Sequence, residues 1–174
     1  MLAELVRLPH TKETINTIID FIGDDQAIFK EFMDYFLGED WRITQKCSWV
    51  LGKIGEKKPH LIKPYHKRLV SKLKSTDKGA FKRNIVRLYQ YADIPEEVEG
   101  ELYSQCLNFI LNHSEAIAIR TFSMGVCEQV ATKYTELVPE LISAVEATVP
   151  NVSAGLKNRA MHTLRRLNKL ILTP

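Results

Sequence analysis

The chain has 174 residues, of which 45% are hydrophobic and 26% are charged, and its formal net charge is +3. These values exclude a disordered or fibrous protein and predict one globular domain over residues 1–174. The longest promising stretch without a charged side chain, residues 102–114, is too short to span a membrane. Residues 1–8 carry Glu4 and Arg7 and do not read as a secretory signal. Cysteines that are odd in number and far apart favour reduced thiols, and we therefore expect a cytoplasmic protein.

Apolar side chains recur at helical spacing along the whole chain, and most glycines and prolines lie at the ends of these periodic segments. After Asp40, for example, Cys47, Leu51 and Ile54 form one stripe, and Gly55 with Pro59 is predicted to end that helix and open the next. No alternating pattern typical of a strand and no hairpin dipeptide occurs, so we predict an all-α fold. The predicted helices cover residues 11–22, 25–37, 40–56, 59–74, 77–92, 95–112, 114–133, 135–149 and 153–172.

An internal repeat runs through these segments. Candidate helix N-caps are spaced 37, 37 and 39 residues apart, at Asp40, Asp77, Ser114 and Ser153. Six residues after each cap stands a cation, namely Lys46, Arg83, Arg120 and Arg159. Units of two helices bury their apolar faces only by stacking on their neighbours. The register therefore predicts an α-α superhelix, or α-solenoid, of about four helix pairs plus a terminal helix.

The residues that carry this register also carry a family likeness. They run from Asp40-Trp41-Arg42 to Gly52, from Lys57 to Pro64, from Phe81 to Leu88, from Ile119 to Pro139 and from Lys157 to Leu164. In these segments the chain resembles the HEAT-repeat (armadillo-type) family, whose antiparallel helix pairs stack into a right-handed superhelix. The resemblance implies that the cations at cap-plus-six bond to acceptors in the adjoining turn, with a ligand-binding ladder as the alternative. It implies an architecture rather than one activity, because the family spans scaffolds, transport receptors and a few nucleic-acid enzymes.

The chain is also similar to small bacterial HEAT-repeat proteins that carry an adenylosuccinate lyase label. Its residues do not support that activity, because the lyase superfamily is several times longer and has a Ser-rich loop leading to Met-Pro-x-Lys-x-Asn. The chain lacks His-Glu-x-x-His, Cys-x-x-Cys, Gly-rich phosphate loops and Gly-x-Ser-x-Gly. We therefore predict no enzyme activity, no metal and no cofactor.

Charge is segregated along the chain: the net charge is −6 over residues 1–41, +12 over 42–87, −8 over 88–150 and +5 over 151–174. Within the basic block, Trp49 lies off the apolar stripe and shares its face with cations, a combination enriched at binding hot spots. Two alternatives stay open: a neighbouring helix covers Trp49, or the charged run after Pro59 is a solvated face. The candidate partner-binding residues are Arg42, Lys46, Trp49, Lys53, His60, Lys63, His66 and Lys67.

The predicted function is a non-enzymatic scaffold or adaptor that binds another protein, an acidic one, through the basic block at residues 42–87. The alternative is a nucleic-acid-binding HEAT protein resembling the DNA alkylation repair glycosylases, which use aromatic and Asp residues near the lesion. Trp41, Trp49 and Asp40 are the residues available for that role here, and all three come from one helix.

Overall fold

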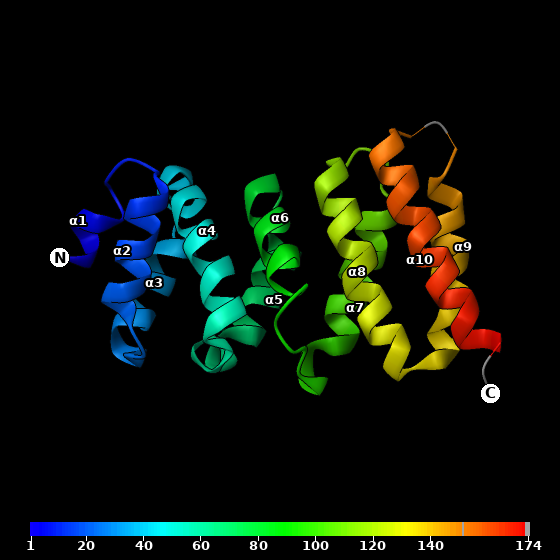
Figure 1. Cartoon of the computed structure of the whole chain (residues 1–174), viewed down its shortest axis with the longest axis horizontal. Helices are drawn as coiled ribbons and strands as arrows, with labels where there is room; N and C mark the ends of the chain where they lie inside the picture. Colours follow the sequence, from blue (N-terminus) through cyan, green and yellow to red (C-terminus); the bar gives the residue numbers. More distant parts are fainter. Residues whose placement is uncertain (151, 173–174) are drawn as a thin grey trace. The chain divides into compact units, whose positions relative to one another are not determined.

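The computed structural model describes residues 1–150 and 152–172, and within these ranges it contains helices and no strand, which confirms the predicted all-α class (Figure 1). All of the predicted helices are present, and the short helix α1 is additional. The segments predicted from residues 59 and 135 each begin with 3₁₀ turns. The elements are α1 (Leu2–Leu5), α2 (Lys12–Ile22), α3 (Gln26–Phe36), α4 (Trp41–Lys57), η1 (Pro59–Leu61), η2 (Lys63–Tyr65), α5 (His66–Ser75), α6 (Gly79–Leu88), α7 (Glu96–Leu111), α8 (Ile117–Lys133), η3 (Thr135–Leu137), α9 (Val138–Thr148) and α10 (Ala154–Leu172).

The chain forms two compact units that meet in sequence between Asp93 and Ile94. In the first unit, α4 packs against α2, α3 and α6, and α5 packs against α6 (Figure 1). In the second unit, α8 packs against α7 and α10, and α9 packs against α7 and α10. The prediction that residues 1–174 form one domain stays a prediction.

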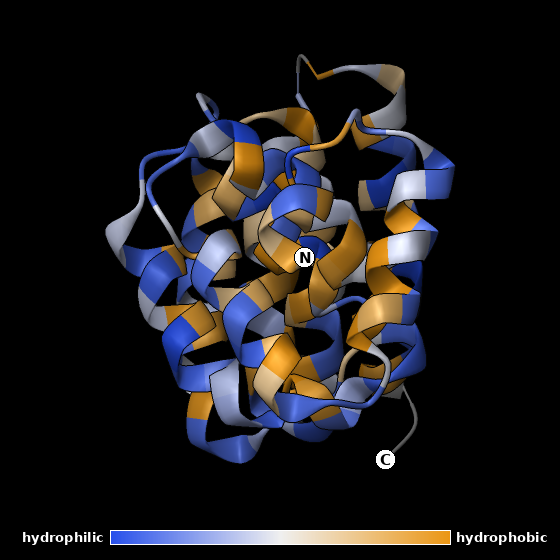
Figure 2. Ribbon diagram, turned by 90° about the vertical axis from the view of Figure 1, so that its left-hand side faces the viewer, coloured by the Kyte–Doolittle hydropathy of each residue, from blue (hydrophilic) through white to orange (hydrophobic). Residues whose placement is uncertain are grey.

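Aromatic side chains hold the core of the first unit together. Phe29 of α3 meets Tyr65 edge to face at a ring-centroid distance of 5.4 Å, and Phe36 meets Phe81 of α6 at 5.6 Å. The three phenylalanines are at most 1% exposed. Each buried ring contributes about 1.5–3 kcal/mol of hydrophobic stabilisation, so these contacts hold α3 against η2 and α6. Most helices carry both hydrophobic and hydrophilic residues along their length, as amphipathic helices do (Figure 2).

Two of the four predicted caps are confirmed. The Asp40 carboxylate accepts hydrogen bonds from the backbone N–H groups of Arg42 and Ile43, and the Ser153 hydroxyl accepts one from Leu156. Asp77 and Ser114 are not caps, because α6 and α8 begin slightly later, with N-caps at Lys78 and Ala116. At both places a neighbouring side chain forms the turn instead: Thr76 accepts from the Lys78 N–H, and Asn112 from the Ser114 N–H.

Gly55 does not end α4 as predicted; the helix continues through it to Lys57. A Cβ atom at Gly55 would overlap Cδ1 of Leu88 in α6 and would lie 3.3 Å from Cδ1 of Ile62. The missing side chain therefore lets α4 and α6 pack closely, which explains the buried glycine inside the apolar stripe. Gly52, one turn earlier, has no atom within 4 Å of the corresponding position.

Because of this difference, replacing glycine by alanine should have opposite effects on the free energy of unfolding at positions 55 and 52. Gly55→Ala should lower the free energy of unfolding by about 1 kcal/mol or more, since overpacking at fully buried Leu88 exceeds the gain in helix propensity. Gly52→Ala should raise it by about 0.5–1 kcal/mol. Urea denaturation followed by circular dichroism measures both, and equal shifts for the two variants would contradict the close packing at Gly55.

Candidate partner-binding surface

Helix α4 presents a stripe of four predicted residues at helical spacing: Arg42, Lys46, Trp49 and Lys53. Trp49 is 46% exposed, and Trp41, at the start of the same helix, is 55% exposed. The interpretation that a neighbouring helix covers Trp49 is therefore wrong. Two large aromatic side chains on one helix remain accessible, which is unusual for residues of this size.

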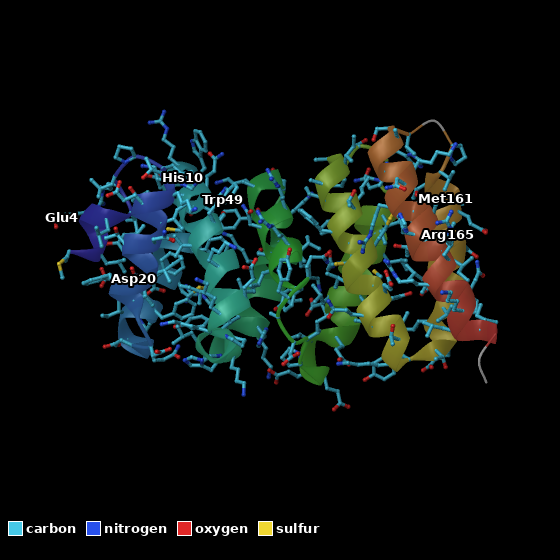
Figure 3. The ribbon with its side chains drawn as sticks, viewed as in Figure 1. Glu4, His10, Asp20, Trp49, Met161 and Arg165 are labelled. Atoms are coloured by element: carbon cyan, nitrogen blue, oxygen red, sulfur yellow. The ribbon has the colours of Figure 1, made fainter. Side chains whose placement is uncertain are left out.

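Each indole has a cation beside its ring. The Arg42 guanidinium lies 5.6 Å from the Trp41 ring centroid, and that of Arg87 in α6 lies 5.2 Å from Trp49. The His10 ring meets Trp49 edge on at 5.8 Å, and Figure 3 shows these two side chains close together. Such cation–aromatic contacts contribute about 0.5–1 kcal/mol each at exposed sites and fix the orientation of the groups involved.

Lys46 explains how His10 reaches Trp49. Its ammonium group donates to the backbone carbonyls of Arg7 at 3.0 Å and Leu8 at 2.8 Å, which ties the segment before α2 to α4. Lys46 therefore positions the surface and is not a free cation on it. Lys53 pairs with Glu56 of its own helix at 2.8 Å.

Three hollows adjoin the two indoles, and none of the described residues that line them is an Asp or Glu. A hollow of about 430 Å³ lies between Trp41 and Trp49, one of about 400 Å³ lies between Trp49 and the start of α2, and one of about 310 Å³ lies between Trp41 and α6. The second has Ile15 and Lys12 in its lining. We call this surface the tryptophan face; it comprises His10, Lys12, Ile15, Trp41, Arg42, Trp49, Lys53 and Arg87.

The other half of the predicted set lies elsewhere. His60, Lys63, His66 and Lys67 belong to η1, η2 and α5 rather than to α4. His66 is only 5% exposed, and its Nδ1 lies 3.1 Å from the hydroxyl of Tyr89, so its inclusion as a surface contact is wrong. His60 lies 3.3 Å from the carboxylate of Asp24. The structure thus divides the candidates between two places on the first unit.

Part of the charge of the basic block is neutralised within the chain. Lys58 pairs with Asp24 at 3.5 Å, and Arg68 of α5 pairs with Asp34 of α3 at 3.1 Å. Lys30 and Arg68 together hold the pKa of Asp34 below its ordinary value, outweighing the opposing effect of burial. The acidic first segment therefore lies against the basic one, which a count of charges along the sequence did not anticipate.

Sequence analysis missed four members of the tryptophan face: His10, Lys12, Ile15 and Arg87. The numbering contains a signal for Arg87, which follows Trp49 by 38 residues, about one repeat. Arg87 and Trp49 each lie nine residues after the N-cap of their helix and therefore stack side by side, whereas His10 lies before the N-cap of α2 and is placed by the bonds that Lys46 makes to Arg7 and Leu8. Neither His10 nor Arg87 is conspicuous in its own segment of the sequence.

The cations at cap-plus-six behave as predicted at three of four positions. Besides Lys46, Arg120 donates from Nε to the carbonyl of Ile110 at 3.1 Å, and Arg159 lies 3.8 Å from the Glu128 carboxylate. Arg120 is 3% exposed, and this burial lowers its pKa. The prediction is wrong for Arg83, which is exposed and makes no hydrogen bond or ion pair with the described residues.

The second unit contains a hollow of about 530 Å³ between α7, the end of α8 and α9. Glu99, 3% exposed, accepts hydrogen bonds there from Lys133 and, at 2.8 Å, from the hydroxyl of Tyr134. The hydroxyl of Tyr103 donates to Glu140 at 3.1 Å. Burial alone would raise the pKa of Glu99, but these two donors lower it overall. The buried polar groups of this hollow thus pair with one another.

The cysteines are buried, and the side chains that commonly bind metals do not cluster within the described residues. Cys47, Cys106 and Cys127 are buried free thiols, and burial raises the pKa of Cys47 to about 12. Over residues 1–150 and 152–172, no three His, Cys, Asp or Glu side chains come together as a metal site would require. None of the helices in those ranges combines the length and apolar character needed to cross a bilayer.

The fold and this surface define an all-α protein of stacked helix pairs. A family model described as "HEAT repeat domain" matches residues 3–167, so the chain belongs to the HEAT repeat family, and the predicted HEAT-like α-solenoid class is confirmed. No curated protein and no solved structure matched the chain. The predicted similarity to proteins labelled adenylosuccinate lyase is not shown by these comparisons. HEAT repeats commonly serve as scaffolds for protein interactions.

The buried carboxylate of Glu99 predicts a defined pH dependence. Because its folded-state pKa is lowered, its stabilising contribution is present above the unfolded value of about 4.3 and is lost as the pH falls through the folded value. Glu99→Gln should lower the free energy of unfolding by about 1–3 kcal/mol at neutral pH. The gap to the wild type should narrow below about pH 4.

Urea titrations at several pH values test this expectation. Glu96→Gln is the matched control, because Glu96 is exposed and lines the same hollow. It should change the stability by less than about 0.5 kcal/mol. A Glu99→Gln curve that runs parallel to the wild type at every pH would exclude the role assigned to this carboxylate.

Proposed function

We propose that this protein is a non-enzymatic interaction scaffold that binds a partner protein through the tryptophan face. One observation carries the proposal: two indoles, each about half exposed, stand beside hollows without a carboxylate and beside two arginines. Trp and Arg are the residues that most often dominate the binding energy of protein interfaces. Leaving them exposed costs hydrophobic stabilisation, which binding of a partner recovers.

The charge pattern supports an acidic partner. Arg42 and Arg87 form no ion pair with the described residues, and Lys12 is exposed at the edge of the face. Cations on η1 and α5 have partners of their own in Asp24 and Asp34. We therefore propose that the partner contacts α4 and its neighbours rather than the whole basic block. Of the predicted contact residues, Arg42, Trp49 and Lys53 remain part of this surface.

A catalytic nucleic-acid function has less support. The Asp40 carboxylate caps α4 through two backbone N–H groups, so it is engaged in a structural role. Arg87 and His10 flank the ring of Trp49, which leaves less of the flat surface on which a base would stack.

The buried free thiols suit a reducing compartment, and we place the scaffold in the cytoplasm.

Capture from the native cell with matched variants tests the proposal. The double substitution Trp41→Ala and Trp49→Ala should reduce recovery of a bound protein by at least about tenfold, because hot-spot truncations cost 2 kcal/mol or more. Tyr91→Ala is the control, since Tyr91 is 58% exposed in the same unit and lies outside the face. Quantitative mass spectrometry compares the three captures. Equal recovery by all three, or no recovered protein, would contradict the proposal.

A further inference from the structure

The two arginines of the tryptophan face are arranged to bind carboxylates. A guanidinium placed over an aromatic ring keeps its N–H edge free, and that edge matches the two oxygens of a carboxylate. Arg42 lies over Trp41 and Arg87 over Trp49 in this way. Neither pairs with a carboxylate in the ranges that the structure describes, although 21 Asp and Glu residues occur in the chain. Both forks are therefore held in place without an internal ligand.

We propose that these two arginine–tryptophan stacks bind an acidic segment of the partner protein in extended conformation, through two carboxylates four residues apart. This inference rests on the proposed function and specifies the chemistry of its partner. Trp41 and Trp49 are eight residues apart on α4, which corresponds to about 12 Å along the helix axis. Four residues of an extended peptide span about 13 Å, and side chains at that spacing lie on the same side.

The hollows provide room for side chains between and beside these carboxylates. Trp41 and Trp49 both line the hollow of about 430 Å³ between them, together with Gln45. The hollow beyond Trp49 adds Ile15, an apolar contact, and Lys12, a further cation. A segment with acidic residues at two positions and an apolar side chain nearby therefore complements the face in charge and in shape.

The arrangement favours such a peptide over a nucleic acid. Cations that follow a phosphate backbone form a continuous track, and aromatic rings that bind bases present open surfaces. Here Lys46 is bonded to two carbonyls, Lys53 pairs with Glu56, and both indoles have a guanidinium above them. Two separate forks remain, with Lys12 at the edge of the face, which suits two carboxylates better than a run of phosphates.

The chain carries its own reporter for a direct test. Trp41 and Trp49 are its two tryptophans, so selectively excited indole fluorescence reports on this face. The probe is a synthetic acidic peptide with Glu at the first and fifth of five central positions and Leu between them. Its matched control has Gln at both positions, and a single-stranded DNA oligonucleotide is the second probe. The full-length chain is titrated with each at physiological salt.

We expect saturable binding of the Glu peptide and at least about tenfold weaker binding of the Gln peptide, because each fork loses a charge-assisted pair of hydrogen bonds. Arg87→Lys keeps the charge but loses the fork, and it should weaken binding of the Glu peptide about tenfold. Arg83→Lys is the control, since Arg83 is an exposed, unpaired arginine on the same helix. It should leave the affinity unchanged, and circular dichroism confirms that both variants fold.

The outcomes separate this inference from the function on which it rests. Equal affinity for the two peptides, equal effects of Arg87→Lys and Arg83→Lys, or tighter binding of the oligonucleotide would overturn the carboxylate forks. Absence of peptide binding while capture of a native partner still depends on Trp41 and Trp49 would also refute the inference, but the scaffold function would stand. If neither peptide binding nor capture of a native partner depends on Trp41 and Trp49, both proposals fail.

Discussion

Contact between residues about one repeat apart is the constraint on which the other features depend. A single helix pair cannot bury its apolar face, so each pair is stabilised by packing against the next. The polar contacts follow the same interval: Lys46 reaches Arg7 across 39 residues, Arg68 reaches Asp34 across 34, and Arg166 reaches Glu128 across 38. These bonds occur in both units. Each fixes the rotation of one helix pair relative to its neighbour, which hydrophobic packing alone leaves less well defined.

The same constraint creates the tryptophan face. Trp49 and Arg87 occupy equivalent places in successive repeats, each nine residues after the N-cap of its helix, and therefore become neighbours; His10 joins them from the segment before α2. Lys46 secures this arrangement, because it holds the segment that carries His10 against α4. The surface is thus a product of the repeat. A residue that was predicted to contact a partner directly contributes instead by placing others.

Periodicity made the helices and their register predictable, because apolar spacing and caps such as Asp40 act within one helix and need no knowledge of neighbours. The role of the cap-plus-six cations was expected from the family resemblance, and Lys46, Arg120 and Arg159 find acceptors outside their own helices, whereas Arg83 does not. What sequence reasoning could not supply was the identity of the neighbours. It read Gly55 as a helix end because glycine commonly ends helices, whereas the structure uses it for contact with Leu88. It read His66 as exposed because the flanking residues are basic, whereas Tyr89 covers it.

The neighbours seen in the structure change how the segregation of charge along the sequence is interpreted. Residues 1–41 are acidic and residues 42–87 are basic, and stacking places parts of the two against each other, so Asp24 pairs with Lys58 at the end of α4 and Asp34 pairs with Arg68 of α5. That pairing occurs beside α3 and α5, where both signs are present. The hollows of the tryptophan face lack carboxylates, and there the arginines lie over indoles instead. Internal ion pairs therefore neutralise part of the basic block, and the two arginines that lie over the indoles are among its cations that form no ion pair with the described residues.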